Sequence, residues 1–367
     1  METRKKTRTI YIGKVPIGGG NPIVVQSMTK TDTADVSSTV RQIKSLEASG
    51  CEIIRLAVPN QESAKALGKI KQSITTPMIA DIHFNWRLAL EAIEQGVEGL
   101  RINPGNIGPR WKVKEIITAA KERGIVVRIG VNAGSLEKEL LRKYRHITPE
   151  ALVESAERHI QVLEDMDFTN LKVSLKGSDV LTTVEAYKLF SERFDYPLHI
   201  GVSEAGPPST GIIKSSVGLG ILLSEGIGDT IRVSLTAKPE EEVRVAYEIL
   251  KSLGIRKKGV EIISCPTCGR CGIDLMRLAT EVEYRLRAIE RPMKVAVMGC
   301  VVNGPGEARE ADIGIAGSKG RGILFRKGKI IKTIREENLL DELMNEISLW
   351  RQSEFRESCR KRPKISL

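Results

Sequence analysis

Short runs rich in Val and Ile recur along the first two thirds of this chain, and each is followed by a stretch with helical periodicity. Strands that alternate with helices predict a parallel sheet, because a helix is the usual connection between parallel neighbours. Eight such units in a row favour a closed (β/α)8 barrel of the TIM type over an open sheet. The expected strands are Ile23–Met28, Ile53–Val58, Met78–Phe84, Gly99–Pro104, Val126–Asn132, Leu171–Lys176, Pro197–Glu204 and Asp229–Leu235.

The segments between these strands have the apolar spacing of amphipathic helices. A helix at Pro239–Leu253 would complete the eighth unit, and the Gly-rich stretch Thr9–Gly20 is expected to form a hairpin that caps the bottom of the barrel. The other expected helices are Val36–Ser49, Gln61–Ser73, Asn85–Gln95, Lys112–Arg123, Pro149–Asp165, Thr182–Phe194 and Lys214–Glu225.

A smaller α/β domain is expected to follow the barrel. We predict a barrel over residues 1–253, a second domain over 254–350, and a basic C-terminal tail over 351–367. The expected elements of the second domain are the strand Val260–Ser264, the helix Asp274–Ile289, the strand Lys294–Met298, the strand-like runs Ala311–Ala316 and Gly322–Lys332, and the helix Asn338–Trp350.

Composition limits the compartment of the chain. No apolar run approaches the ~20 residues that a membrane-spanning helix needs. The polar N-terminal segment shows no signal peptide, so we expect a cytoplasmic protein without a membrane anchor. Six cysteines in 367 residues are too few for a disulfide framework, and their clustering favours metal binding in a reducing compartment.

The formal charge of +11 leaves three interpretations open. They are a solvated surface, nucleic-acid binding, and an anionic substrate together with an acidic protein partner, since a positive field steers both. No aromatic-rich basic motif supports the nucleic-acid interpretation.

Four arginines lie inside the Val/Ile-rich strands, at equivalent places in their units. A buried arginine is costly unless an anion meets it, so four of them predict an anion pocket inside the barrel. Guanidinium groups match phosphate oxygens in pairs, which favours a small phosphorylated substrate and, with four arginines, a diphosphate. The four are Arg55, Arg101, Arg128 and Arg232.

Other polar residues gather at the ends of the same strands, where a barrel has its mouth. The turns after Asn103 and Asn132 contain glycine and offer backbone N–H donors, and Lys172 and Ser234 lie in or beside strands. Glu204 begins a loop and is a candidate proton donor, with a salt bridge as its alternative role. His83 and His199 are either site residues or buried, hydrogen-bonded histidines.

The cysteines of the second domain permit three interpretations. Cys265, Cys268, Cys271 and Cys300 match either a closed zinc site or a four-cysteine electron-transfer cluster. In the third interpretation, Glu307 replaces Cys271 in an iron–sulfur cluster with one exchangeable ligand, because the tight turn Asn303-Gly-Pro-Gly-Glu can fold Glu307 back over Cys300. Spacing alone slightly favours the four-cysteine sets.

These motifs together resemble a known family, the bacterial 4-hydroxy-3-methylbut-2-enyl diphosphate synthases of the non-mevalonate isoprenoid pathway. The resemblance covers about residues 7–350. Its most specific segments are Val25-Gln-Ser-Met-Thr, Ala80-Asp-Ile-His-Phe, Arg101-Ile-Asn-Pro-Gly-Asn, Gly130-Val-Asn-Ala-Gly-Ser, Ser203-Glu-Ala-Gly, Gly228-Asp-Thr-Ile-Arg-Val-Ser, Cys265-Pro-Thr-Cys-Gly-Arg and Gly299-Cys-Val-Val-Asn-Gly-Pro-Gly-Glu.

The resemblance implies the reductive ring opening and dehydration of 2-C-methyl-D-erythritol 2,4-cyclodiphosphate to 4-hydroxy-3-methylbut-2-enyl diphosphate. It also implies an exchangeable Glu307 ligand and a proton-donating Glu204. The implied cofactor is a [4Fe–4S] cluster held by Cys265, Cys268, Cys300 and Glu307. The implied substrate-binding residues are Arg55, Arg101, Asn103, Arg128, Asn132, Lys172, Arg232 and Ser234.

The resemblance further implies a homodimer, in which the barrel of one chain faces the cluster domain of the other, and an acidic electron donor, flavodoxin or ferredoxin. Cys271 departs from the family pattern, and we expect it to be a bystander. Two alternatives remain: a pterin- or phosphate-binding barrel with a purely structural cluster, and a zinc-bearing RNA-binding protein. The strand arginines argue against the RNA alternative, because they are expected in a pocket and not on a face.

Overall fold

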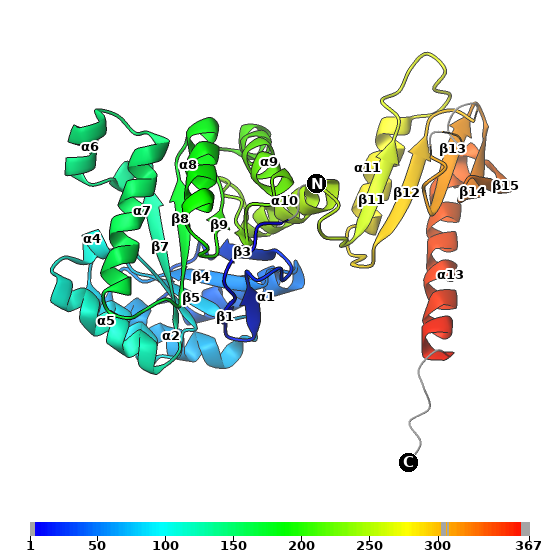
Figure 1. Ribbon diagram of the computed structural model, residues 1–367. Helices are drawn as coiled ribbons and strands as arrows, with labels where there is room; N and C mark the ends of the chain where they lie inside the picture. The colour runs from blue at the N-terminus through cyan, green and yellow to red at the C-terminus, as the bar shows by residue number, and fades with distance from the viewer. Residues whose placement is uncertain (1–3, 302–305, 307, 361–367) are drawn as a thin grey trace. The chain divides into compact units, whose positions relative to one another are not determined.

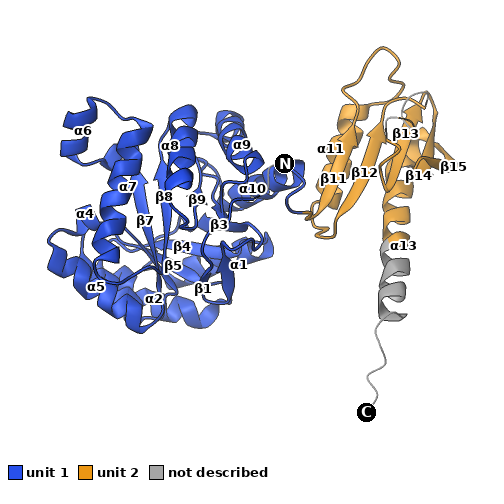
Figure 2. Ribbon diagram, in the orientation of Figure 1, with its two compact units in different colours: residues 1–256 blue, residues 257–367 orange. Residues whose placement is uncertain are grey.

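The computed structural model describes residues 4–301, 306 and 308–360, with side chains described up to Trp350 (Figure 1). The chain divides into two compact units, residues 1–256 and residues 257–367, coloured separately in Figure 2. We call them unit 1 and unit 2. The division lies close to the boundary expected after residue 253.

Unit 1 is a (β/α)8 barrel, as the alternation of strands and helices predicts. Eight parallel strands follow the order β8-β7-β6-β5-β4-β3-β10-β9, and a parallel bridge between Val173 and Leu198 joins the two ends of this series. The strands are β3 (Val24–Met28), β4 (Ile53–Ala57), β5 (Met78–Asp81), β6 (Gly99–Ile102), β7 (Val126–Asn132), β8 (Leu171–Lys176), β9 (His199–Ile200) and β10 (Thr230–Ile231).

Helices surround the strands, and most begin at a polar side chain that accepts a backbone N–H of the first turn, as Asn60 does from Ser63. The long helices bury apolar side chains, as α3 (Trp86–Glu94) does with Leu88, Ala89, Ala92 and Ile93. The helices are α1 (Val36–Ala48), α2 (Gln61–Ser73), α3 (Trp86–Glu94), α4 (Pro104–Ile107), α5 (Arg110–Glu122), α6 (Lys138–Tyr144), α7 (Pro149–Glu164), α8 (Val180–Arg193), α9 (Pro208–Ser224) and α10 (Pro239–Ser252).

The N-terminal hairpin closes one end of the barrel. Strands β1 (Ile10–Ile12) and β2 (Val15–Ile17) pair antiparallel, and their buried isoleucines form one apolar cluster with Val24, Ile53 and Val126. Those residues stand at the starts of their strands, so the hairpin caps the bottom, as expected. The barrel interior above this layer is polar.

Unit 1 differs from expectation at several element ends: α9 begins at Pro208 and not at Lys214, and β5 ends at Asp81 and not at Phe84. The last two strands are only two residues long, whereas Pro197–Glu204 and Asp229–Leu235 were expected. Beyond Ile200 and Ile231 only single hydrogen bonds continue, such as Arg232 N–H to Ile200 O at 3.1 Å. The short helices α4 and α6 lie in segments expected to be loops.

Over its described residues, unit 2 is a five-stranded mixed sheet with the long helices α11 and α13. The order is β11-β12-β13-β14-β15, in which the first three strands are parallel and the last two antiparallel. The elements are β11 (Val260–Ser264), α11 (Leu275–Leu286), β12 (Met293–Met298), β13 (Ile313–Ser318), β14 (Arg321–Arg326), β15 (Lys329–Arg335) and α13 (Leu339–Arg360). The expected end of the last helix at Trp350 is wrong, because α13 continues through part of the expected tail.

None of the described helices combines the length and the hydropathy that crossing a membrane requires.

Candidate functional site

The upper interior of the barrel holds a cage of basic side chains. Five of them are buried, and the sixth, Arg232, has a side chain that is 15% exposed. Each comes from a strand or from the residues that follow it, because alternate strand residues point into a barrel. The cationic cage consists of Arg55, Arg101, Arg128, Lys172, Lys176 and Arg232.

Only two carboxylates form ion pairs with the cage among the residues that the structure describes. Asp81 at the end of β5 lies 3.2 Å from Arg101 Nη1 and 3.6 Å from Arg55 Nε. Glu242 on α10 lies 3.8 Å from Arg232 Nη2. Six cations therefore face two anions, and the excess positive charge is buried.

Arg128 is the sharpest case of this excess. Its side chain is 2% exposed, and its Nε and Nη1 atoms have no hydrogen-bond partner among the described residues. Buried N–H groups are almost always satisfied, so these donors indicate a missing acceptor. Arg101 Nε and Arg232 Nε are unpaired in the same way.

The pKa shifts of the cage residues also indicate an excess of buried positive charge. Burial, together with the neighbouring Arg55 and Arg101, lowers the pKa of Arg128 well below its usual value. Burial and Arg128 also lower the pKa of Lys172 and of Lys176. An anion in the cage would oppose every one of these shifts, because it favours the charged forms.

Two glycines on the inner wall make room for the cations. A Cβ atom at Gly130 would lie 2.6 Å from Arg101 Nε, and a Cβ atom at Gly201 would lie 2.6 Å from Lys176 Nζ. A larger residue at either position would displace a basic side chain. The glycines therefore set where the cations stand.

The two asparagines at the mouth order the surrounding loops. Asn103 is buried and caps α4 by accepting the Gly105 N–H at 3.1 Å. Asn132, with its amide oriented to satisfy both ends, accepts a hydrogen bond from Arg101 Nη2 at 3.0 Å. Ser234 is half-buried after β10.

Glu204 stands apart from the cage. It is exposed in the loop after β9, and its backbone has a left-handed φ of +52°, which is uncommon for residues other than glycine. It forms no hydrogen bond or ion pair with another described residue. The alternative of a salt bridge to a cage arginine is therefore not present in this structure.

The two histidines differ. His83 is largely exposed, with Nε2 3.8 Å from Asp81. His199 is fully buried; its Nδ1 pairs with Thr230 Oγ1 at 2.8 Å, and its Nε2 has no partner among the described residues. Burial and the nearby lysine Lys176 hold the pKa of His199 well below its usual value, so the ring is neutral.

Three charged residues of this site, Asp81, Lys176 and Glu242, are absent from the sequence-based set. Lys176 was expected at a strand end without a binding role, although its spacing of two and four residues from Ser174 and Lys172 places it on the same inner face. Glu242 belongs to the run Glu240-Glu-Glu on α10, and nothing in that run distinguishes the residue that becomes buried. It accepts from Ser27 Oγ at 3.2 Å and from the Leu235 N–H at 3.1 Å.

In unit 2, the sheet topology gathers cysteines at one end. Strands β11 and β12 are parallel, with Ser264 opposite Val297, so Cys265 and Cys300 follow neighbouring strand ends. The Gly299 N–H points to Cys265 Sγ at 3.4 Å. Cys268 is exposed on the loop between β11 and α11. We call this the cysteine end of unit 2.

The Cys271 sulfur has contacts of its own within unit 2. Its Sγ lies 3.3 Å from the carbonyl oxygen of Ile273, and it packs against the apolar core of unit 2. A Cβ at Gly299 would lie 2.5 Å from this sulfur. Within the described residues no three metal-ligating side chains already converge, and Glu307 lies outside the described residues.

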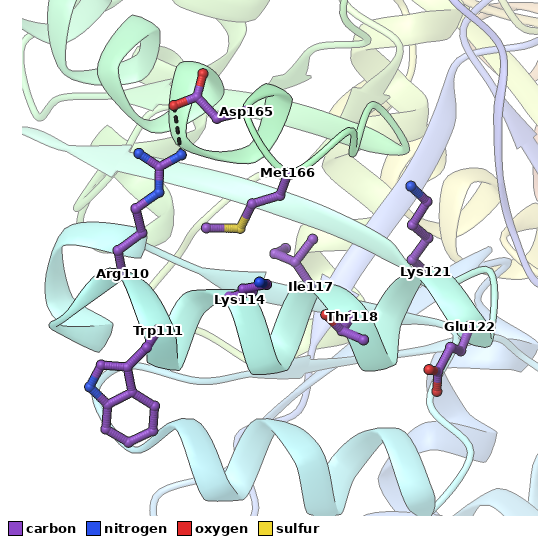
Figure 3. Close-up of a pocket in the computed structure, with 9 residues that line it drawn as sticks. All are labelled: Arg110, Trp111, Lys114, Ile117, Thr118, Lys121, Glu122, Asp165 and Met166. Atoms are coloured by element: carbon purple, nitrogen blue, oxygen red, sulfur yellow. Dashed lines mark hydrogen bonds and ion pairs between the residues drawn. The ribbon is translucent and has the colours of Figure 1, made fainter.

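A pocket of about 730 Å³ lies outside the cage, along α5 and the end of α7 (Figure 3). The ion pair of Arg110 with Asp165, 2.8 Å long, spans one side of it. No cage residue lines this pocket. Its lining residues are Arg110, Trp111, Lys114, Ile117, Thr118, Lys121, Glu122, Asp165 and Met166.

The fold and the site define a TIM-barrel protein with buried basic side chains inside the barrel and a separate, cysteine-bearing α/β domain. The chain belongs to the GcpE family: residues 7–247 match the GcpE TIM-barrel domain, and residues 261–349 match the GcpE protein C-terminal domain.

Relatives with this domain pair are similar over nearly their whole lengths. A protein of Thermodesulfovibrio yellowstonii is 64% identical over 95% of this chain and 99% of its own, and one of Geobacter sulfurreducens is 58% identical over 94% and 98%. Both are named 4-hydroxy-3-methylbut-2-en-1-yl diphosphate synthase (flavodoxin).

Among solved structures, the dihydropteroate synthase of Yersinia pestis matches with a TM-score of 0.50 and 13% identity, over 67% of this chain and 98% of its own. A likeness at this identity concerns the fold alone.

Proposed function

We propose that this protein is an iron–sulfur oxidoreductase that converts 2-C-methyl-D-erythritol 2,4-cyclodiphosphate to 4-hydroxy-3-methylbut-2-enyl diphosphate by reductive ring opening and dehydration. Membership of the GcpE family and the names of relatives at 58–64% identity support this activity. The family resemblance seen in the sequence points to the same reaction.

The observation that carries the proposal is the buried, unpaired guanidinium of Arg128 inside the cationic cage. A cyclic diphosphate brings two adjacent phosphates, whose oxygens accept from several guanidinium N–H groups at once. Such a ligand supplies both the missing acceptors and the missing negative charge. The proposed binding residues are Arg55, Arg101, Asn103, Arg128, Asn132, Lys172, Arg232 and Ser234, to which the structure adds Lys176 as a candidate.

The proposed cofactor is a [4Fe–4S] cluster held by Cys265, Cys268, Cys300 and Glu307. The donor set fits, because thiolates suit iron–sulfur clusters and the Gly299 N–H points at a cluster-side sulfur. Cys271 Sγ lies 3.3 Å from the carbonyl oxygen of Ile273, and we propose that Glu307, and not this sulfur, completes the set. When bound, the cluster supplies electrons and a Lewis-acidic iron with one exchangeable ligand position.

The residues of the barrel have separate tasks in this reaction. The fixed cations hold the diphosphate and neutralise the charge that develops on it as the ring opens, which is electrostatic preorganisation. Neutral His199 adds no further positive charge beneath them. Glu204, exposed at the mouth, is the proposed proton donor to the departing hydroxyl, which leaves as water.

We further propose flavodoxin as the electron donor, with ferredoxin as the alternative, because both relatives carry flavodoxin in their names. The protein would work in the cytoplasm as a homodimer that pairs the barrel of one chain with the second unit of the other. A pterin-binding barrel with a structural cluster and a zinc-bearing RNA-binding protein are not favoured. The RNA-binding alternative is not favoured because the cage cations lie inside the barrel, where RNA cannot reach them.

The test is anaerobic turnover of the cyclodiphosphate with reduced flavodoxin, followed by product analysis. The purified protein is expected to contain iron, absorb near ~400 nm and release the linear diphosphate. Glu307→Ala should abolish most turnover while some brown colour persists. Iron-free protein that was purified anaerobically, or a cluster-loaded protein without product, would contradict the proposal.

A further inference from the structure

Exposed basic residues surround the cysteine end of unit 2. This end carries the carboxyl termini of β11, β12 and β13, the start of α11 and the turn between β13 and β14. These segments lie together: a Cβ at Gly272, next to Cys271, would lie 2.8 Å from the backbone nitrogen of Lys319. The cationic collar, as we call it, consists of Arg270, Arg277, Lys319, Arg321 and Arg335.

Most of the collar has no anionic partner. Arg270, Arg277, Lys319 and Arg321 form no ion pair with another described residue, and only Arg335 approaches a carboxylate, that of Glu337 at 3.7 Å.

The other acidic side chains of this end are already engaged by the backbone. Asp274 caps α11 by accepting the Arg277 N–H at 3.2 Å, and Glu336 accepts the Gly320 N–H at 2.9 Å.

One pair of arginines within the collar destabilises the sheet of unit 2. Arg321 on β14 and Arg335 on β15 are direct cross-strand partners. Like charges placed directly opposite each other on a sheet are destabilising. The pair therefore contributes nothing to holding the sheet together, and an acidic partner would relieve the repulsion.

The same end of unit 2 also carries exposed apolar side chains. Met276, in the first turn of α11, is 74% exposed, and Val301, next to Cys300, is 37% exposed. Protein interfaces combine apolar and charged side chains, and methionine adapts to different partner surfaces.

We propose that the cysteine end of unit 2 is the docking surface for an acidic flavoprotein of the flavodoxin type, held by the cationic collar around Met276. The inference deepens the proposed function, because it places the electron donor beside the cysteines that would hold the cluster. Close approach matters, because electron transfer slows steeply with distance. Rim charges of this kind steer encounter and set its salt dependence.

The test compares two double charge reversals with the same change in net charge. R277E/R321E alters the collar, and K327E/K329E alters the β14–β15 hairpin at the opposite end of the sheet. Both variants should fold. Glu at Arg277 lies in the first turn of α11, where a negative charge is favourable, and Glu at Arg321 faces Arg335. The control lysines are exposed and form no ion pair with a described residue.

Binding of FMN-loaded bacterial flavodoxin to each full-length variant is measured directly at low ionic strength. We expect R277E/R321E to raise the Kd about tenfold or more and to flatten its salt dependence, while K327E/K329E changes it less than about threefold. An unchanged Kd for R277E/R321E, or an equal loss in the control, would overturn the docking surface.

Turnover separates docking from substrate binding. With reduced methyl viologen, a small cation that new carboxylates do not repel, R277E/R321E should keep the wild-type rate. An equal loss with viologen and with flavodoxin would assign these cations to the substrate and overturn the proposal. A wild type that forms no product with either donor would defeat the proposed function alone, because the Kd comparison decides the docking surface without turnover.

Discussion

The barrel interior and the cysteine end of unit 2 are both rich in groups that need a ligand, but they meet that need differently. The cage holds its cations buried and fixed, with Arg128 2% exposed and Arg101 tied to Asp81 and Asn132. At the cysteine end, Cys268 is exposed on the loop between β11 and α11, and Cys265 and Cys300 follow neighbouring strand ends.

The difference shows two ways of building a site. Rigid strands preorganise the cage, so the protein carries the electrostatic cost before its ligand arrives. Metal sites on loops are instead completed by the metal, because ligand binding and local folding are coupled. We therefore expect the two regions to respond in opposite ways when a site residue is removed.

The largest effect should distinguish two cysteines of one loop. Cys268→Ser should remove most iron and all turnover. The exposed Cys268 sulfur has no structural contact among the described residues, so its proposed role is to bind iron. Cys271→Ser should keep its iron, since that sulfur lies 3.3 Å from the Ile273 carbonyl oxygen and is not among the proposed ligands. Iron content and the visible spectrum, measured anaerobically, decide the matter. Equal iron loss in both variants would restore the four-cysteine interpretation.

In the cage, removal of a cation should weaken binding and stabilise the empty protein. Arg128→Met removes charge-assisted hydrogen bonds to phosphate, and we expect roughly a hundredfold loss of substrate affinity. The free energy of unfolding without substrate should rise by about 1–4 kcal/mol, because an unpaired buried charge is removed. Calorimetry and denaturant unfolding measure the two quantities.

Arg110→Met is the matched control for that variant. Arg110 is exposed, pairs with Asp165 beside the outer pocket of Figure 3, and should affect stability by less than about 1 kcal/mol and affinity not at all. A loss of affinity in this control would mean that the cage is not the anion site.

A smaller effect should follow from one methyl group on the barrel wall. Gly130→Ala places a Cβ 2.6 Å from Arg101 Nε, so the guanidinium must move, and we expect about a tenfold loss of affinity. Gly220→Ala on α9, where a Cβ meets nothing within 4 Å, is the control and should bind as the wild type does. Equal affinities of the two variants would show that the position of Arg101 does not matter for binding.

The smallest effect concerns pH. Burial lowers the pKa of Lys172 well below its usual value, so the unfolded chain binds the extra proton between the folded pKa and about 10.4. The stability difference between wild type and Lys172→Met should therefore rise with pH in this window, by at most about 1.4 kcal/mol per unit. Saturating substrate should flatten the trend in this window, because it favours the charged lysine in the folded chain.

The contribution of Lys188 to stability should change with pH in the opposite direction. Its hydrogen bond to Glu225 raises its pKa, so its small contribution should be lost as pH rises through the folded value. Unfolding curves for Lys188→Met over the same pH range make this comparison, and parallel trends for the two lysines would contradict the assignment of Lys172 to the cage.

Much of the barrel could be predicted from the sequence, because a regular pattern defined it. The strands β7 and β8 match the expected Val126–Asn132 and Leu171–Lys176 at both ends, since alternation and flanking polar residues bound them. Strand β9 could not be predicted in length. Gly201 follows it directly and leaves no room for a side chain beside Lys176, a constraint that comes from another strand.

The candidate site likewise contains residues that could be predicted from the sequence and residues that could not. The four strand arginines could be found because charge inside a Val/Ile run is anomalous, and the structure places them in the barrel, although their contacts with substrate stay a prediction. Glu242 could not be found, because it is buried only through the packing of α10. The set Cys265, Cys268, Cys300 and Glu307 also stays a prediction, since spacing could not separate Cys271 from it.

The most direct test of the account is calorimetric titration of the cyclodiphosphate into wild type and Arg128→Met. We expect one site per barrel in the wild type, with binding that weakens as salt rises and roughly a hundredfold lower affinity in the variant. The same affinity in both proteins, or no binding to the wild type, would contradict the claim that the barrel is built around a diphosphate.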